Sequence, residues 1–193
     1  MSYHPQTVVQ DMRRWLERAV IGLNLCPFAK AVHVKGQVHY AVSAATAAAE
    51  LRRDLLAELR DLAAMDAQQR DTTLLIAPLA FPDFLDFNDF LAEADQALAE
   101  LGLEGELQIA SFHPRYRFAG TAPDDITNFT NRAPYPTLHL LREASIERAV
   151  QAFPEAEAIY EANMATLERL GPEGWHALDL GPTPQGSAEE GRR

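Results

Sequence analysis

The residues most able to do chemistry in this chain lie between positions 111 and 142. This segment contains four Arg, two His, four Pro and no Lys. Its only acids are Asp124 and Asp125, so its formal charge is +2 in a chain whose net charge is −11. Loops that hold Arg, His, Asn and aromatic rings between packed elements are where ligands usually bind. The composition therefore predicts that this segment lines a pocket for a small anionic molecule.

The run that follows His113 could form an anion clamp. In an extended chain, Arg115 and Arg117 face the same side, and the aromatic residues next to them face the other. One face could then hold a carboxylate or phosphate while the other packs. The alternative is an edge segment with solvated arginines. His113 ends a predicted strand, which suits an acid–base group, and its alternative is a packed histidine that bonds a backbone carbonyl.

A second polar cluster occupies residues 128–136. Asn128 and Asn131 carry side chains that bond backbone readily, and two prolines stiffen the same turn. The functional interpretation uses this rigidity to aim Arg132 and an Asn amide at a substrate, with Tyr135 as a further ligand contact. The alternative is a rigid turn whose polar groups bond only the protein itself.

Two further candidates lie in residues 137–142. His139 is a candidate catalytic group, and its alternative is a half-buried histidine in a strand. Arg142 would hold the anion together with Arg117 and Arg132.

Cys26 is a candidate nucleophile or ligand, because a thiol at the start of a helix would face unpaired backbone N–H groups. The alternative is a small packed hydrophobe beside a proline. Cys26 could pair with either His113 or His139. These three side chains could also form a mixed metal site with Asp124 or Asp125, and Cys-Pro could ligate a haem iron. However, no two candidate ligands have the short sequence spacing that is typical of metal sites. The sequence therefore assigns no metal and leaves the cofactor unknown.

Several function classes lose support. The chain has no G-x-G-x-x-G, no Walker loop, no G-x-S-x-G and no H-E-x-x-H. Its net charge of −11 opposes nucleic-acid binding. No stretch approaches the roughly 20 apolar residues of a membrane span, and the start lacks a secretion signal. A single cysteine agrees with a reducing compartment. We expect a cytoplasmic protein that binds neither nucleic acid nor membranes. The sequence does not determine its oligomeric state.

Hydrophobic periodicity predicts alternating strands and helices. Helices are expected at 7–23, 45–65, 86–101, 145–153 and 154–170, and strands at 37–43, 72–77, 106–112 and 137–141. The last of these strands could instead begin a helix. Strands that alternate with helices favour parallel neighbours joined by right-handed crossovers. We expect one α/β domain over residues 1–180, with a small mixed sheet of about four strands flanked by helices, and a disordered tail at 181–193.

Three sequence motifs recur in a known family. They are LCPFA at 25–29, FHP at 112–114 with Tyr116 and Phe118 after it, and NxTNRxPYPxxHLLRE at 128–143. With them the chain resembles a family of uncharacterised bacterial proteins, described as a domain of unknown function, over about residues 7–170. The resemblance implies no activity, so it predicts the family and leaves the function open.

Three functions follow from these residues. The leading one is an enzyme for a small anionic metabolite, in which Arg117 and Arg132 hold the anion and His113 transfers a proton. The second is a non-enzymatic binding module that docks a protein partner through Tyr135 and Arg132. The third is a structural motif that ties the loop to the helices. A concave pocket favours the first, a flat exposed face the second, and complete hydrogen bonding the third.

Overall fold

A computed structural model describes residues 3–152 and 158–182 of the chain. Within these residues, helices and strands alternate for most of the length. The elements are α1 (Pro5–Trp15), η1 (Leu16–Ile21), α2 (Ala29–Val34), β1 (Val38–Val42), α3 (Ala48–Ala64), β2 (Thr72–Ile76), α4 (Phe84–Leu101), β3 (Leu107–Phe112), η2 (Ile126–Asn131), β4 (Thr137–Arg142), α5 (Glu143–Ala152) and α6 (Ala158–Ala177). Each predicted strand agrees with an observed strand to within one residue at either end, and residues 137–141 are a strand.

The four strands form one mixed sheet in the order β1-β2-β4-β3. β1 and β2 are parallel, as the strand–helix–strand pattern predicted. β2 and β3 are not neighbours, because β4 lies between them and is antiparallel to both. The carboxyl ends of β1, β2 and β3 therefore share one edge of the sheet with the start of β4. This is the edge from which residues 113–136 emerge.

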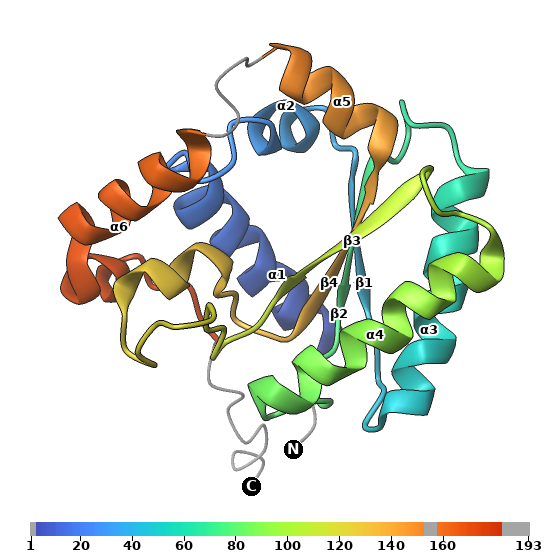
Figure 1. The fold of residues 1–193 in the computed structure, drawn as a ribbon, viewed down its shortest axis with the longest axis horizontal. Helices are drawn as coiled ribbons and strands as arrows, with labels where there is room; N and C mark the ends of the chain where they lie inside the picture. The colour runs from blue at the N-terminus through green and yellow to red at the C-terminus, as the bar shows by residue number, and fades with distance from the viewer. Residues whose placement is uncertain (1–2, 153–157, 183–193) are drawn as a thin grey trace, which may run out of the picture.

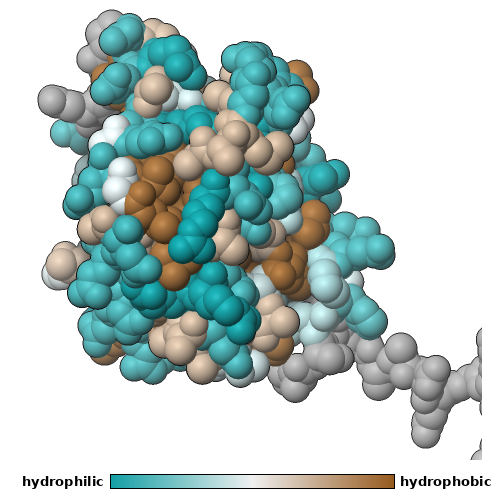
Figure 2. Space-filling model, turned by 90° about the vertical axis from the view of Figure 1, so that its right-hand side faces the viewer, coloured by the Kyte–Doolittle hydropathy of each residue, from teal (hydrophilic) through white to brown (hydrophobic). Residues whose placement is uncertain are grey.

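Helices cover both faces of the sheet (Figure 1). α3 and α4 pack together on one face, where Leu138 and Leu140 of β4 enter their core. α1 and η1 cover the other face with Val8, Met12 and Trp15. Alternate residues of a strand point to opposite faces, so each strand supplies both cores. The outer side of α3 and α4 is mostly hydrophilic, with separate hydrophobic areas (Figure 2). The predicted α/β class with a small mixed sheet flanked by helices is confirmed.

The helices differ from the sequence prediction at their ends. The first helix begins at Pro5, two residues before its predicted start, and has no side-chain cap. Its last turn is a π-helix, in which the Gly22 amide donates to the Glu17 carbonyl at 3.0 Å. Gly102, at φ 65°, ends α4 directly after residue 101, where the sequence placed the end of this helix.

The last helix continues past its predicted stop. Gly171, with φ 66° and ψ 173°, breaks the helical backbone where the sequence placed the end. The following Pro172 then starts a further turn that reaches Ala177. The predicted start at residue 154 lies outside the described residues, and so do positions 183–193 of the predicted tail. In the described part of the chain, no helix combines the length and apolar character needed to cross a bilayer.

Candidate functional site

His113 lies directly after β3 at the edge where the strands end, as predicted. Its ring packs on α4, with centroid distances of 5.5 Å to Phe84 and 5.3 Å to Phe87. Only 1% of the residue is exposed. His113 therefore belongs to the packed wall between β3 and α4.

Both ring nitrogens of His113 have backbone partners. The Arg115 amide donates to Nδ1 at 3.0 Å, and Nε2 lies 3.0 Å from the Phe81 carbonyl oxygen. Nδ1 accepts a hydrogen bond, so the ring proton sits on Nε2 and bonds that carbonyl. Burial lowers the pKa of His113, which favours this neutral form. In this arrangement His113 joins the turn after β2 to the loop after β3.

Asn128 is fully buried and its side chain ties together the loop that follows β3. Its Oδ1 accepts from the Phe118 amide at 2.9 Å and from the Thr121 hydroxyl at 2.7 Å. Its Nδ2 donates to the Ala122 carbonyl at 2.8 Å. Three of its four hydrogen-bonding positions are thus occupied by the protein.

Arg132 also bonds the loop. Its Nε donates to the Tyr116 carbonyl at 3.2 Å and its Nη2 to the Pro123 carbonyl at 2.5 Å. The guanidinium lies over the Phe129 ring, 4.1 Å from its centroid. Asn131 donates from Nδ2 to the Ser111 carbonyl at 3.3 Å. These contacts match the alternative of a rigid turn whose polar groups bond the protein itself, because the side chains of Arg132 and Asn131 hold the loop in shape.

Tyr135 and Arg142 lie away from this loop. The Tyr135 hydroxyl is buried and donates to Asp11 Oδ2 in α1 at 2.7 Å. Arg142 ends β4 at the opposite edge of the sheet, where its Nη2 donates to the Leu62 and Met65 carbonyls at 2.7 Å each. Leu62 lies in the last turn of α3 and Met65 directly follows the helix, so Arg142 caps its C-terminal end. The structure does not bring Arg142 together with Arg117 or Arg132.

The other candidate acid–base and nucleophilic groups lie on the α1 face of the sheet. Cys26 is partly buried against the core there, which also contains Trp15 and Phe112. The His139 ring is 6.1 Å from the Phe112 ring. Cys26 and His139 therefore share a face, whereas His113 packs against α4 on the other. Among residues 3–152 and 158–182, no group of three His, Cys, Asp or Glu side chains could hold a metal ion.

Arg117 is the predicted ligand-binding residue that stays available. It is exposed, and it forms no hydrogen bond or ion pair with the residues that the structure describes. It lines a groove of about 500 Å³ between the first turns of α4 and the loop after β3, which we call the α4 groove. The groove is lined by Phe84, Leu85, Asn88, Arg117, Phe118, Ala119, Gly120 and Thr121.

Sequence reasoning found only part of this groove. It singled out Arg117 and the ring beside it, and it missed the wall made by Phe84, Leu85 and Asn88. One signal could have found that wall. Asp83 follows β2 and caps α4 by accepting from the Leu85 amide at 2.9 Å, so α4 begins at the edge where His113 emerges.

Comparison with known proteins identifies the family and no activity. The chain belongs to the family described as "Protein of unknown function (DUF1415)", whose profile matches residues 7–177. This confirms the resemblance seen in the sequence. No curated protein and no solved structure matches the chain. A functional assignment must therefore come from the site itself.

Proposed function

We propose that this chain, as a member of a family of unknown function, binds a small anionic molecule in the α4 groove. The observation that carries the proposal is the guanidinium of Arg117 in that groove, which has no partner among residues 3–152 and 158–182. The other three arginines of the segment, Arg115, Arg132 and Arg142, donate to backbone carbonyls. A free guanidinium beside a concave surface suits a carboxylate or phosphate group.

The surroundings of Arg117 fit a ligand with one charged end. Asn88, Gly120 and Thr121 line the groove together with Arg117 and add polar groups to it. Asp83 caps the first turn of α4 and Asp86 lies in that turn, so Arg117 is the source of positive charge among the residues that line the groove. The Phe84 and Phe118 rings supply apolar walls. Such a groove suits an anion that also carries a small apolar or planar part.

Binding is better supported than catalysis in this arrangement. His113, the nearest predicted acid–base group, packs behind Phe84 with both nitrogens bonded to backbone. We propose that His113 holds the groove in shape. An enzymatic role for the loop stays a prediction, and it would require His113 to leave one of these bonds for a substrate.

A second candidate function, docking of a protein partner, rests on exposed apolar side chains beside the groove. Leu85 is 59% exposed and Tyr160 of α6 is 50% exposed. The Tyr160 ring stands edge-on to Phe118 at 6.1 Å. Aromatic and Arg side chains around a groove are also typical of protein interfaces.

We further propose that the protein works in the cytoplasm on small molecules and without a nucleic-acid partner. A single cysteine supports a reducing compartment. A net charge of −11 supports repulsion from phosphate backbones.

The test combines native mass spectrometry with amide NMR titration. The protein as purified is weighed intact under native and denaturing conditions, which detects a retained small molecule. The 15N-labelled protein is then titrated with inorganic phosphate and with citrate. We expect shifts at residues 117–121 and in the first turn of α4, and a Kd about tenfold weaker in Arg117→Gln, since a charge-assisted hydrogen bond contributes roughly 1.5 kcal/mol or more.

Arg60→Gln is the matched control, because Arg60 is an exposed arginine on α3. It should bind both anions like the wild type. The proposal would be refuted if the chemical-shift changes lay only outside the α4 groove, or if the wild type and Arg117→Gln bound the anions with equal affinity. Shifts confined to Leu85 and Tyr160 on addition of a protein, with none from either anion, would favour docking instead.

A further inference from the structure

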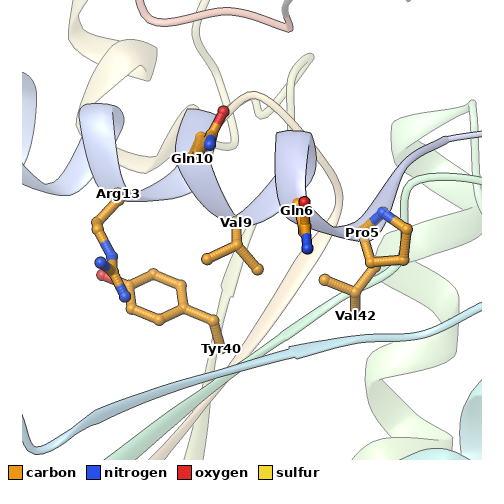
Figure 3. A pocket seen from close by; sticks show the side chains of 7 residues that line it. All are labelled: Pro5, Gln6, Val9, Gln10, Arg13, Tyr40 and Val42. Atoms are coloured by element: carbon orange, nitrogen blue, oxygen red, sulfur yellow. The ribbon is translucent and has the colours of Figure 1, made fainter.

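A second groove lies between α1 and β1, on the face of the sheet opposite α4. It has a volume of about 460 Å³ and is lined by Pro5, Gln6, Val9, Gln10, Arg13, Tyr40 and Val42. In Figure 3 the Tyr40 and Val42 side chains rise from β1 toward α1, and the Arg13 side chain descends to the Tyr40 ring. β1 is an edge strand, so the groove opens at the side of the sheet. We call it the α1–β1 groove.

The α1 side of this groove follows from helix periodicity. Gln6, Val9, Gln10 and Arg13 are spaced three, four and seven residues from the first of them, so they share one stripe of the helix. This stripe is distinct from the core stripe that contains Val8. The α1–β1 groove therefore has its own helix face, with an apolar residue set among polar ones.

One buried donor in the groove lacks an acceptor among the described residues, the Tyr40 hydroxyl. The Arg13 side chain lies close enough to this hydroxyl to lower its pKa, against the larger effect of burial. The Arg13 guanidinium lies over the Tyr40 ring, 5.4 Å from its centroid, and has no carboxylate partner among those residues. Glu17, one turn further along the chain, contacts His33 Nε2 at 3.2 Å instead. A buried hydroxyl without a partner costs stability, so the pair is suited to an acceptor from outside.

The protonation state of Tyr40 supports a donor role. Burial raises the pKa of its hydroxyl to about 12. The hydroxyl therefore keeps its proton at neutral pH, and Arg13 keeps its positive charge. The groove presents one cation and one neutral donor side by side.

From these observations we infer that the α1–β1 groove binds a monocarboxylate with an apolar body. The carboxylate would accept from the Tyr40 hydroxyl and the Arg13 guanidinium. The apolar body would lie against Val9, Val42 and Pro5, with the amides of Gln6 and Gln10 at the rim. One cation balances one negative charge, whereas a phosphate dianion would need a second cation that the lining residues do not supply.

The test uses benzoate as the probe and benzamide as its neutral counterpart of the same shape. Amide NMR titrations are run on wild type, Arg13→Gln, Tyr40→Phe and Arg60→Gln. We expect benzoate to shift Val9, Tyr40 and Val42 in the wild type and to bind at least tenfold better than benzamide. Arg13→Gln and Tyr40→Phe should each weaken benzoate at least fivefold.

Arg60→Gln serves as the matched control here, because it removes an exposed arginine from α3, on the opposite face of the sheet. It should leave benzoate binding unchanged, and shifts at Val9, Tyr40 and Val42 are followed separately from shifts at residues 117–121, so failure of one site says nothing about the other. The stability of Tyr40→Phe without ligand gives a second readout. We expect it to equal or exceed that of the wild type, since the removed hydroxyl has no acceptor among the residues that the structure describes.

Three results would overturn the inference. Benzoate and benzamide could bind equally well, which would show that the charge is not recognised. Both variants could keep the wild-type affinity. Tyr40→Phe could lower the stability of the free protein, which would show that the hydroxyl serves the fold.

Discussion

His139 should make the stability of this protein sensitive to mild acid. Its Nε2 lies 2.6 Å from the Thr72 hydroxyl oxygen, and that hydroxyl donates to the Leu140 carbonyl at 2.7 Å. The one hydroxyl proton is used for the carbonyl, so Nε2–H of His139 is the donor. Burial lowers the pKa of His139 to about 4. A second proton would give this ring a positive charge among apolar side chains, which is unfavourable.

The size of the effect follows from linkage. A histidine in the unfolded chain titrates near 6.5, so the unfolded state takes up the proton first as the pH falls. The contribution of neutral His139 is therefore complete above about pH 6.5 and is lost as the pH falls toward 4. The full loss corresponds to about 3 kcal/mol, of which about 2 kcal/mol is lost at pH 5. These values are upper limits, since part of the residue is accessible to water.

The assay is urea unfolding of wild type and His139→Gln at pH 7.5 and pH 5.0. Glutamine keeps a side-chain N–H for Thr72 and cannot titrate. We expect the wild type to lose up to about 2 kcal/mol more than the variant between the two pH values. Some acid sensitivity should remain, because the pKa of buried His113 is lowered as well.

His176→Gln is the control, since His176 is exposed on the last turn of α6 and should behave like the wild type. Equal losses of stability in wild type and His139→Gln would refute the reasoning. That result would mean that the folded protein accommodates the charged ring without cost.

Two further predictions concern buried polar contacts. Arg142→Met should lower the free energy of unfolding by about 2–3 kcal/mol, because the last carbonyls of α3 lose their donor. Urea unfolding checks this, and a change below about 0.5 kcal/mol would contradict the capping role. Tyr135→Phe should cost about 1.5–3 kcal/mol, because buried Asp11 loses a hydroxyl donor. Thermal unfolding should show a lower Tm, and an unchanged Tm would mean that other contacts of Asp11 suffice.

The loop after β3 shows that the type of a residue does not by itself determine its role. Asn128, Asn131 and Arg132 carry the groups that a ligand site needs, and the sequence predicted them as such. The same groups can bond backbone carbonyls and amides of a tight loop. In the structure these bonds form to residues 111 and 116–123. Arg117 takes no part in that network among the described residues and lines the α4 groove, which only the path of the chain between residues 113 and 121 decides.

The α1–β1 groove shows the opposite case. Arg13 and Tyr40 lie 27 positions apart in the numbering, and neither stands out in the sequence. They meet because α1 crosses the face of β1 that carries Tyr40. Hydrophobic patterning could place each residue on its element, yet it could not say which helix stripe would face which strand.

The sequence by itself determined the strands, most of the helices that flank the sheet, and the family, because these depend on local periodicity, turn residues and short motifs. It also determined that His113 follows a strand at the edge where sheet ligands bind. The tertiary structure decided that β4 lies between β2 and β3. It also separated Arg142 from Arg117 and placed His113 and Cys26 on opposite faces. Such placements depend on packing between distant segments, and packing energy leaves no local pattern in the chain.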